Sequence, residues 1–172
     1  MDHFYTNNVY LRKEKFSIHE LNRHNILKSI VLCSLCFIPN IIYTYYIDEK
    51  ILNFPFRQIL TTNEIIASGF PVNVIGILIT SLIWGFFEGF NYVVISDKIN
   101  ECYPSKNTWL NWGAISCGVL CILVHGVIGV TVNGILETVS IFIIIYGMLM
   151  VKNITKNAWD CVFIFIMFWN AY

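Results

Sequence analysis

Charged residues are scarce in this chain. Of its 172 residues, 13% are charged and 56% are hydrophobic, and the formal net charge is zero. A soluble globular domain carries about a quarter charged residues, so this chain has too few to cover a surface that faces water. The charges also cluster between apolar runs instead of alternating with apolar residues. We therefore predict an all-α, polytopic protein of the cell membrane that contacts the lipid bilayer.

Several motifs of soluble proteins are also missing. The sequence has no Gly-rich phosphate loop, no His-Glu-x-x-His pair and no nucleophile elbow, so nothing in it indicates the enzymes that depend on them. It has no basic patch beyond the N-terminal one, which topology and anionic lipids explain, and we predict no nucleic-acid partner. No secretory signal peptide is expected, because the first apolar run begins near residue 29 and no small-residue cleavage site follows it.

The apolar residues form runs of the length that a membrane span needs. At about 20 residues per span, the length of the chain allows about five transmembrane helices. The predicted spans are Ser29–Ile47, Val72–Ile95, Leu110–Val130, Ile135–Val151 and Ala158–Tyr172. Residues 1–28 are expected to be a cytoplasmic N-terminal segment, and residues 29–172 the transmembrane helical domain.

Lysines and arginines indicate the orientation. They concentrate in residues 1–28 and in the two other segments expected on the same side, whereas the opposite side has only Lys50 and Arg57. Positive residues prefer the cytoplasmic side, so we predict a cytoplasmic N-terminus. The segment Lys50–Pro71 mixes apolar and charged residues, and a helix lying in the membrane interface is the favoured interpretation there.

Glu88 and His125 are ionisable residues inside long apolar stretches. Such groups are costly in hydrocarbon, so each is a candidate functional residue facing the interior of the bundle. Asn91 and Tyr92 follow Glu88 at helical spacing and are predicted to share its face. Cys121 precedes His125 by one turn. Thiolate and imidazole are both good zinc ligands, although a buried cysteine is also an ordinary packing residue.

Helical rise places three polar residues at similar depth in the membrane. Glu88 lies about 15 Å from the predicted inner interface, whereas His125 and Asn170 each lie about 20 Å from it. Helix tilt can accommodate this difference. A shared site near the middle of the membrane is therefore geometrically possible.

The region from residue 82 to residue 172 resembles the CAAX-protease and bacteriocin-processing (CPBP) family of intramembrane metalloproteases. That family has a Glu-Glu-x-x-x-Arg motif, then a Phe-x-x-x-His motif, and a His-x-x-x-Asn/Asp motif on a later helix. Phe87-Glu88 takes the first position here, and Cys121-Ile-Leu-Val-His125 takes the second. Asn157-Ala-Trp159 follows the layout before the last motif, and Asn170 falls near the closing Asn.

The resemblance implies hydrolysis of a peptide or membrane-protein substrate by zinc-bound water. Glu88 and His125 would be catalytic, and His125, Asn170 and Cys121 would be the candidate metal ligands. The chain departs from the family pattern at three places. It has one Glu instead of two, Tyr92 or Val93 at the position of the Arg, and Ile166 or Phe165 at the position of the last His. The sequence therefore fits two interpretations: an active protease, or a non-proteolytic relative such as a bacteriocin self-immunity protein.

A second class of function also fits the sequence. In a small membrane transporter component or scaffold, Glu88 and His125 would line a polar cavity without metal. The chain is short for a complete transporter and has no internal repeat, so it would need a homo-oligomer or another subunit. Metal content and peptide cleavage distinguish the first class of function from the second.

Overall fold

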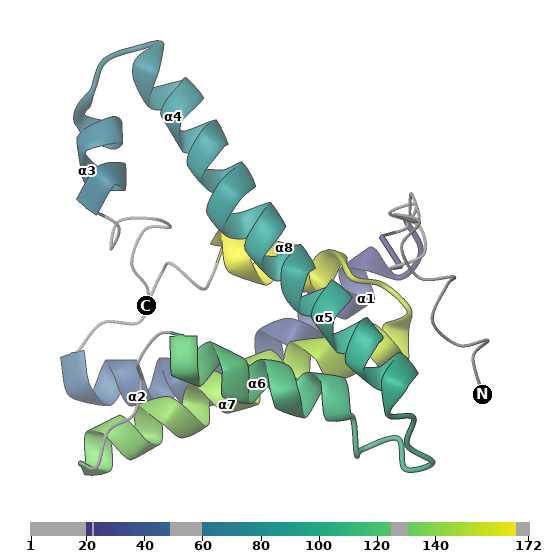
Figure 1. The fold of residues 1–172 in the computed structure, drawn as a ribbon. Helices are drawn as coiled ribbons and strands as arrows, with labels where there is room; N and C mark the ends of the chain where they lie inside the picture. The colour runs from purple at the N-terminus through teal and green to yellow at the C-terminus, as the bar shows by residue number, and fades with distance from the viewer. Residues whose placement is uncertain (1–19, 22, 49–59, 125–130, 168–172) are drawn as a thin grey trace, which may run out of the picture.

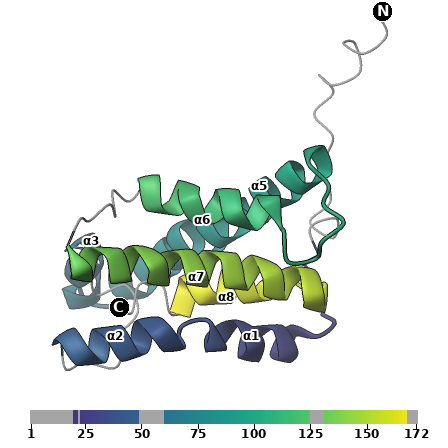
Figure 2. The same cartoon turned by 90° about the horizontal axis from the view of Figure 1, so that it is seen from below.

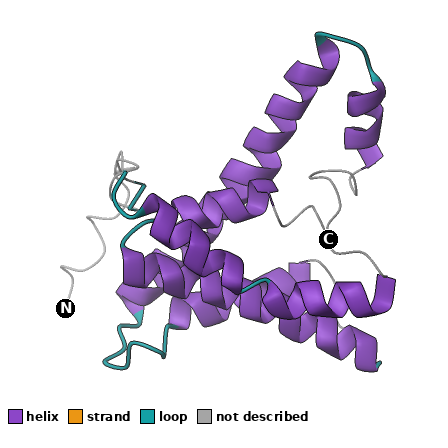
Figure 3. Cartoon of the chain, turned by 180° about the vertical axis from the view of Figure 1, so that it is seen from behind, coloured by secondary structure: helices purple, strands orange, loops and turns teal. Residues whose placement is uncertain are grey.

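The computed structural model describes residues 20–21, 23–48, 60–124 and 131–167, and over these ranges every regular element is a helix (Figure 3). In chain order the elements are α1 (Ile26–Leu35), α2 (Ile38–Asp48), α3 (Leu60–Ala67), α4 (Val72–Thr80), the π-helical segment η2 (Ser81–Phe87), α5 (Glu88–Cys102), α6 (Trp112–Val124), α7 (Val132–Thr155) and α8 (Trp159–Met167). The predicted all-α class is confirmed for this part of the chain.

Two helices in the described ranges are long and apolar enough to cross a membrane. One is the continuous helix formed by α4, η2 and α5, which runs from Val72 to Cys102 over 31 residues, and the other is the 24-residue α7. The predicted spans Val72–Ile95 and Ile135–Val151 lie within them. The bent pair α1 and α2 adds a third candidate if the two helices form one span. The described α6 and α8 are shorter than the spans predicted there.

The first predicted span, Ser29–Ile47, is broken in the structure. Its two halves, α1 and α2, meet at a bend of 42° after Cys36. Pro39 lies in the first turn of α2, where the missing N–H of proline is tolerated. Phe37 at the break is only 1% exposed. Burial of this ring therefore holds the bend against the rest of the bundle.

The helix α7 is the centre of the bundle. It packs against α6 on one side and against α1 and α2 on the other, with α8 also in contact (Figure 2). Its buried residues include Ile144, Ile145, Met148 and Leu149, all at most 1% exposed. In contrast, α3 and α4 extend away from the bundle as a helical hairpin (Figure 1). Apolar side chains on its outer surface, such as Leu78 at 65% exposure, are consistent with contact to lipid.

The helices α5 and α8 approach closely at Gly89. A Cβ atom at this position would lie 2.7 Å from the Cys161 carbonyl oxygen and 3.0 Å from the Val162 Cα atom. Small residues allow helix backbones in membranes to approach in this way. The contact brings the first turn of α5 against the middle of α8.

Three segments that the sequence predicts on one side of the membrane meet at one end of the bundle. Asn25, before α1, donates its side-chain amide to the Thr155 carbonyl of α7 at 3.2 Å. The Ala158 amide, just before α8, donates to the Glu20 carbonyl at 3.1 Å. The end of α5 joins them through Asp97. We call this end of the bundle the Lys152 end.

Candidate functional site

The predicted site residues fall into two groups. His125 and Asn170 lie outside the described residues. Glu88, Asn91 and Tyr92 lie in the first two turns of α5, and Cys121 lies near the end of the described part of α6. The described residues can therefore test the contacts of this second group.

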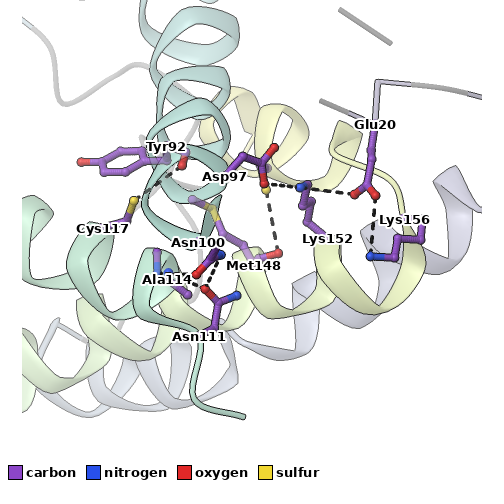
Figure 4. A network of polar contacts seen from close by, with 12 residues as sticks. Glu20, Tyr92, Asp97, Asn100, Asn111, Ala114, Cys117, Met148, Lys152 and Lys156 are labelled. Carbon is purple, nitrogen blue, oxygen red and sulfur yellow. Dashed lines mark hydrogen bonds and ion pairs between the residues drawn. The ribbon is translucent and has the colours of Figure 1, made fainter. Parts of the chain in front are cut away.

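Glu88, Tyr92 and Cys121 come together between α5 and α6, and we call them the Glu88 site. The Tyr92 hydroxyl and the Cys121 thiol lie close to each other, and both residues lie within electrostatic range of Glu88. The Cys117 thiol, one turn before Cys121, donates to the Tyr92 carbonyl at 3.5 Å (Figure 4). Tyr92 and Cys121 are buried and Glu88 is half-buried, whereas Asn91 is exposed. Asn91 therefore does not share the buried surroundings of Tyr92.

Tyr92 also contacts α8. Its ring stacks on the ring of Phe165, with centroids 5.4 Å apart and planes at 20°. Both rings belong to the hydrophobic core, with exposures of 7% and 0%. In the comparison with the CPBP pattern, Tyr92 or Val93 was expected at the position of the Arg, and Ile166 or Phe165 at the position of the last His. One alternative from each position is therefore a neighbour of the other in space.

The described residues of the Glu88 site do not form a zinc site by themselves. They contribute one carboxylate and one thiol, and no three His, Cys, Asp or Glu residues gather around a metal position anywhere in the described ranges. A catalytic zinc normally has three protein ligands besides water. This set of donors does not fit that requirement. Chemically, the site offers a hydrogen-bonding carboxyl beside a phenol and a thiol.

A second polar group, at the Lys152 end, was not predicted from the sequence. Lys152 is only 5% exposed although it carries a charge. Its Nζ atom lies 2.5 Å from Asp97 Oδ1 and 3.3 Å from Glu20 Oε2, and Lys156 Nζ lies 3.7 Å from Glu20 Oε1 (Figure 4). We call these four residues the Lys152 network. Their charges compensate one another, which a buried ion needs.

Two asparagines hold α6 to α5 beside this network. Asn100 donates its side-chain amide to Asn111 Oδ1 at 2.7 Å, and its own oxygen accepts from the Gly113 amide at 2.8 Å (Figure 4). Asn111 Oδ1 also accepts from the Ala114 amide at 2.9 Å. These bonds satisfy backbone donors at the start of α6, which would otherwise lack partners.

A pocket of about 760 Å³ opens between the Lys152 network and the loop that connects α5 to α6. All four residues of the network line it, together with the Asn100–Asn111 pair and Trp109. Trp109 is 70% exposed, and its carbonyl accepts a hydrogen bond from the Tyr146 hydroxyl of α7. The pocket thus gives the charged network access to the surroundings of the bundle.

The local sequence gave only a weak signal for the Lys152 network. Lys152 directly follows the apolar run Ile135–Val151, and this position indicates the end of a span. Its partners lie 55 residues away on α5, at Asp97, and in the N-terminal segment, at Glu20. No periodicity connects such distant residues.

The fold and these two polar groups define a class: an all-helical protein with helices suited to a membrane, polar side chains buried between them, and ion pairs at one end. Comparisons with protein-family models, with curated proteins and with solved structures find no match for this chain.

Proposed function

We propose that this chain is an integral membrane protein with a CPBP-like arrangement of motifs that acts without proteolysis. It would bind a peptide or a membrane protein, as expected of a bacteriocin self-immunity relative. The observation that carries the proposal is the stack of Tyr92 on Phe165. In one of the two registers considered for each motif, the aromatic pair takes the positions at which the family pattern has a cationic side chain and a metal-binding imidazole.

The chemistry of these positions supports the proposal. Phe165 has no metal-binding atom and is fully buried in the core. Ile166, the alternative position for the missing His, has its Cγ1 atom where a Cβ of Gly85 would lie, so it fills the contact between α8 and η2. In either register an apolar side chain packs at the position of a ligand. We derive no hydrolytic step through zinc for this reason.

Glu88 then has a binding role instead of a catalytic one. Its carboxyl group lies within electrostatic range of the Tyr92 hydroxyl and the Cys121 thiol, and polar contacts between side chains join helices in a membrane at about 1 kcal/mol each. The site would hold α5 against α6 and present a half-buried carboxyl group to a ligand between the helices.

Metal content of the detergent-purified protein tests the proposal. We expect far less than one zinc per chain in the wild type, and no change in His125→Ala or Cys121→Ser. We also expect no cleavage of a peptide library presented in lipid vesicles. Near-stoichiometric zinc that is lost in His125→Ala, together with cleavage that is lost in Glu88→Gln, would overturn the proposal and establish a metalloprotease.

We further propose about five spans, with the Lys152 end and the N-terminus in the cytoplasm. Lysines and arginines concentrate in the segments that meet at this end, as the positive-inside rule requires. Labelling with a membrane-impermeant thiol reagent tests the orientation. A cysteine at Ser105, in a variant without native cysteines, should react only after the cytoplasmic side is made accessible. Reaction in intact cells would contradict the predicted orientation.

The pocket favours a second candidate function, that of a subunit of a membrane transporter. It leads from the bundle surface to the buried Lys152, and buried ionisable residues mark substrate and proton pathways in membrane proteins. Reconstitution in liposomes distinguishes the two candidates. Solute or proton flux that requires Lys152 would favour the transporter subunit, and its absence would favour the binding protein.

A further inference from the structure

Asp160 is a carboxylate buried inside the bundle. It lies in the first turn of α8 and is 0% exposed. Neither of its side-chain oxygens has a partner with full hydrogen-bond geometry among the described residues. The donors close to it are its own backbone amide and the amide and thiol of the following residue, Cys161. The roles proposed for the Glu88 site and for the Lys152 network do not explain why a carboxylate is buried at this position.

The groups that face Asp160 are mostly neutral thiols. From α1, Cys33 and Cys36 lie within electrostatic range, and Cys161 is its neighbour on α8. From α7, the charged group that faces it is Lys152. The helix α5 also packs against α8. Of its charged residues at this end, Asp97 is bonded to Lys152, and Lys98 pairs with Glu101.

These surroundings do not compensate a negative charge. Removing an ionised carboxylate from water costs several kcal/mol, whereas the start of a helix contributes only about 0.3–1 kcal/mol. Lys152 already balances Asp97 and Glu20. A carboxylate left without compensation in this way is more stable when it takes up a proton. The neutral acid is also the form that fits among buried thiols.

The geometry favours a proton over a larger cation. Both oxygens of Asp160 have almost no accessible surface, so a hydrated ion cannot reach them without separating the helices. Within the described ranges, no cluster of three His, Cys, Asp or Glu residues offers a metal position. A proton needs no such space, because it binds to one oxygen as part of a carboxylic acid.

We propose that Asp160 is a proton-binding residue of the membrane domain, and that it exchanges its proton with water through the pocket at the Lys152 end. The Asp160 carboxylate takes one proton from a hydronium ion in the pocket, so that a neutral carboxylic acid and a water molecule form. Release reverses this step. Lys152 connects the pocket with Asp160, because it lines the pocket and also lies within electrostatic range of Asp160. The proposal does not depend on the proposed function of the Glu88 site.

Infrared spectroscopy of the protein in lipid nanodiscs tests this proposal. Labelling with ¹³C-aspartate separates aspartic acids from Glu88 and the other glutamates. We expect a carbonyl band of a protonated aspartic acid at neutral pH, and we expect its reversible loss as the pH is raised. The band should be absent in Asp160→Asn. The matched control is Asp97→Glu, which removes the ion-paired aspartate but keeps a carboxylate beside Lys152, and it should keep the band.

Two outcomes would overturn the proposal: a wild type without the band, or a band that persists in Asp160→Asn. If Asp160→Asn does not fold, a different variant keeps the test decisive. The aspartates of the chain are Asp2, Asp48, Asp97 and Asp160. Replacing Asp2 and Asp48 by Asn and Asp97 by Glu leaves Asp160 as the sole source of an aspartic acid band and keeps a carboxylate beside Lys152. The presence or absence of the band in that variant therefore decides.

Discussion

The Glu88 site and the Lys152 network both place ionisable side chains inside a helical bundle. They differ in the groups that surround those side chains. In the Glu88 site a half-buried carboxyl group has neutral neighbours, Tyr92 and Cys121. In the Lys152 network two carboxylates and two ammonium groups compensate one another at an end of the bundle where a pocket opens.

The difference lies in the neighbours of the ionisable groups. In the Lys152 network opposite charges face one another, whereas the neighbours of Glu88 described above are a phenol and a thiol. Breaking a charge pair leaves an uncompensated charge, whereas changing a group among neutral neighbours removes only a hydrogen bond. The two regions should therefore respond very differently to substitution.

The largest effect is expected for Lys152→Met. Removing the ammonium group leaves Asp97 and Glu20 uncompensated, and the cost for buried pairs is about 3–5 kcal/mol. We expect the lower part of this range, because both carboxylates keep some contact with solvent. Denaturant unfolding in detergent micelles, followed by tryptophan fluorescence, measures the change in free energy of unfolding.

The control for this prediction is Lys156→Met. Lys156 belongs to the same network but its side chain is 70% exposed, so its ion pair contributes at most about 1 kcal/mol. Equal losses of free energy of unfolding in the two variants would mean that burial does not distinguish the two lysines. That result would contradict the proposed difference between the Lys152 network and the Glu88 site.

An intermediate effect is expected for Gly89→Ala, which tests the contact that places α8 against the Glu88 site. The added Cβ atom would meet backbone atoms of Cys161 and Val162, which cannot move without displacing α8. Overpacking of this kind costs about 1–3 kcal/mol. The matched control is Gly69→Ala, because nothing lies within 4 Å of a Cβ there. Thermal unfolding should separate the two variants, and equal melting temperatures would argue against the close contact.

The smallest effect is expected for Glu88→Gln. Glutamine keeps the size and the hydrogen-bonding capacity of a neutral glutamic acid, so the free energy of unfolding should change by less than about 1 kcal/mol. The same denaturant titration measures it. A loss as large as that of Lys152→Met would mean that Glu88 is an ionised, compensated group, and the two regions would then be alike.

Much of the fold could be predicted because apolar runs are local. The predicted span Ile135–Val151 lies inside α7, whose ends are set by Thr131, which accepts the Gly134 amide, and by Lys156 in a left-handed conformation. A helix within the segment Lys50–Pro71 is present as α3. The bend between α1 and α2 was not predicted, because burial of Phe37 depends on tertiary packing and not on the local pattern.

The candidate site was only partly accessible from the sequence. Helical spacing could relate Glu88 to Tyr92 within one helix, but the stack of Tyr92 on Phe165 requires α5 and α8 to meet. The burial of Lys152 and Asp160 has the same origin. Each looks like a residue near the end of a span, and only the packing of other parts of the chain against them removes them from water.

The continuous helix from Val72 to Cys102 has a consequence for the choice of membrane. Its 31 residues extend about 46 Å at the rise of an α-helix, whereas the hydrocarbon core of a bilayer is about 30 Å thick. A helix that exceeds the bilayer tilts or thickens the surrounding lipid, at a modest cost for each ångström of mismatch. The tilt of this helix would therefore change with membrane thickness, together with the hairpin of α3 and α4 at its start. Because α5 is the end of the same helix, lipid composition would change the contact between α5 and α8 without any ligand.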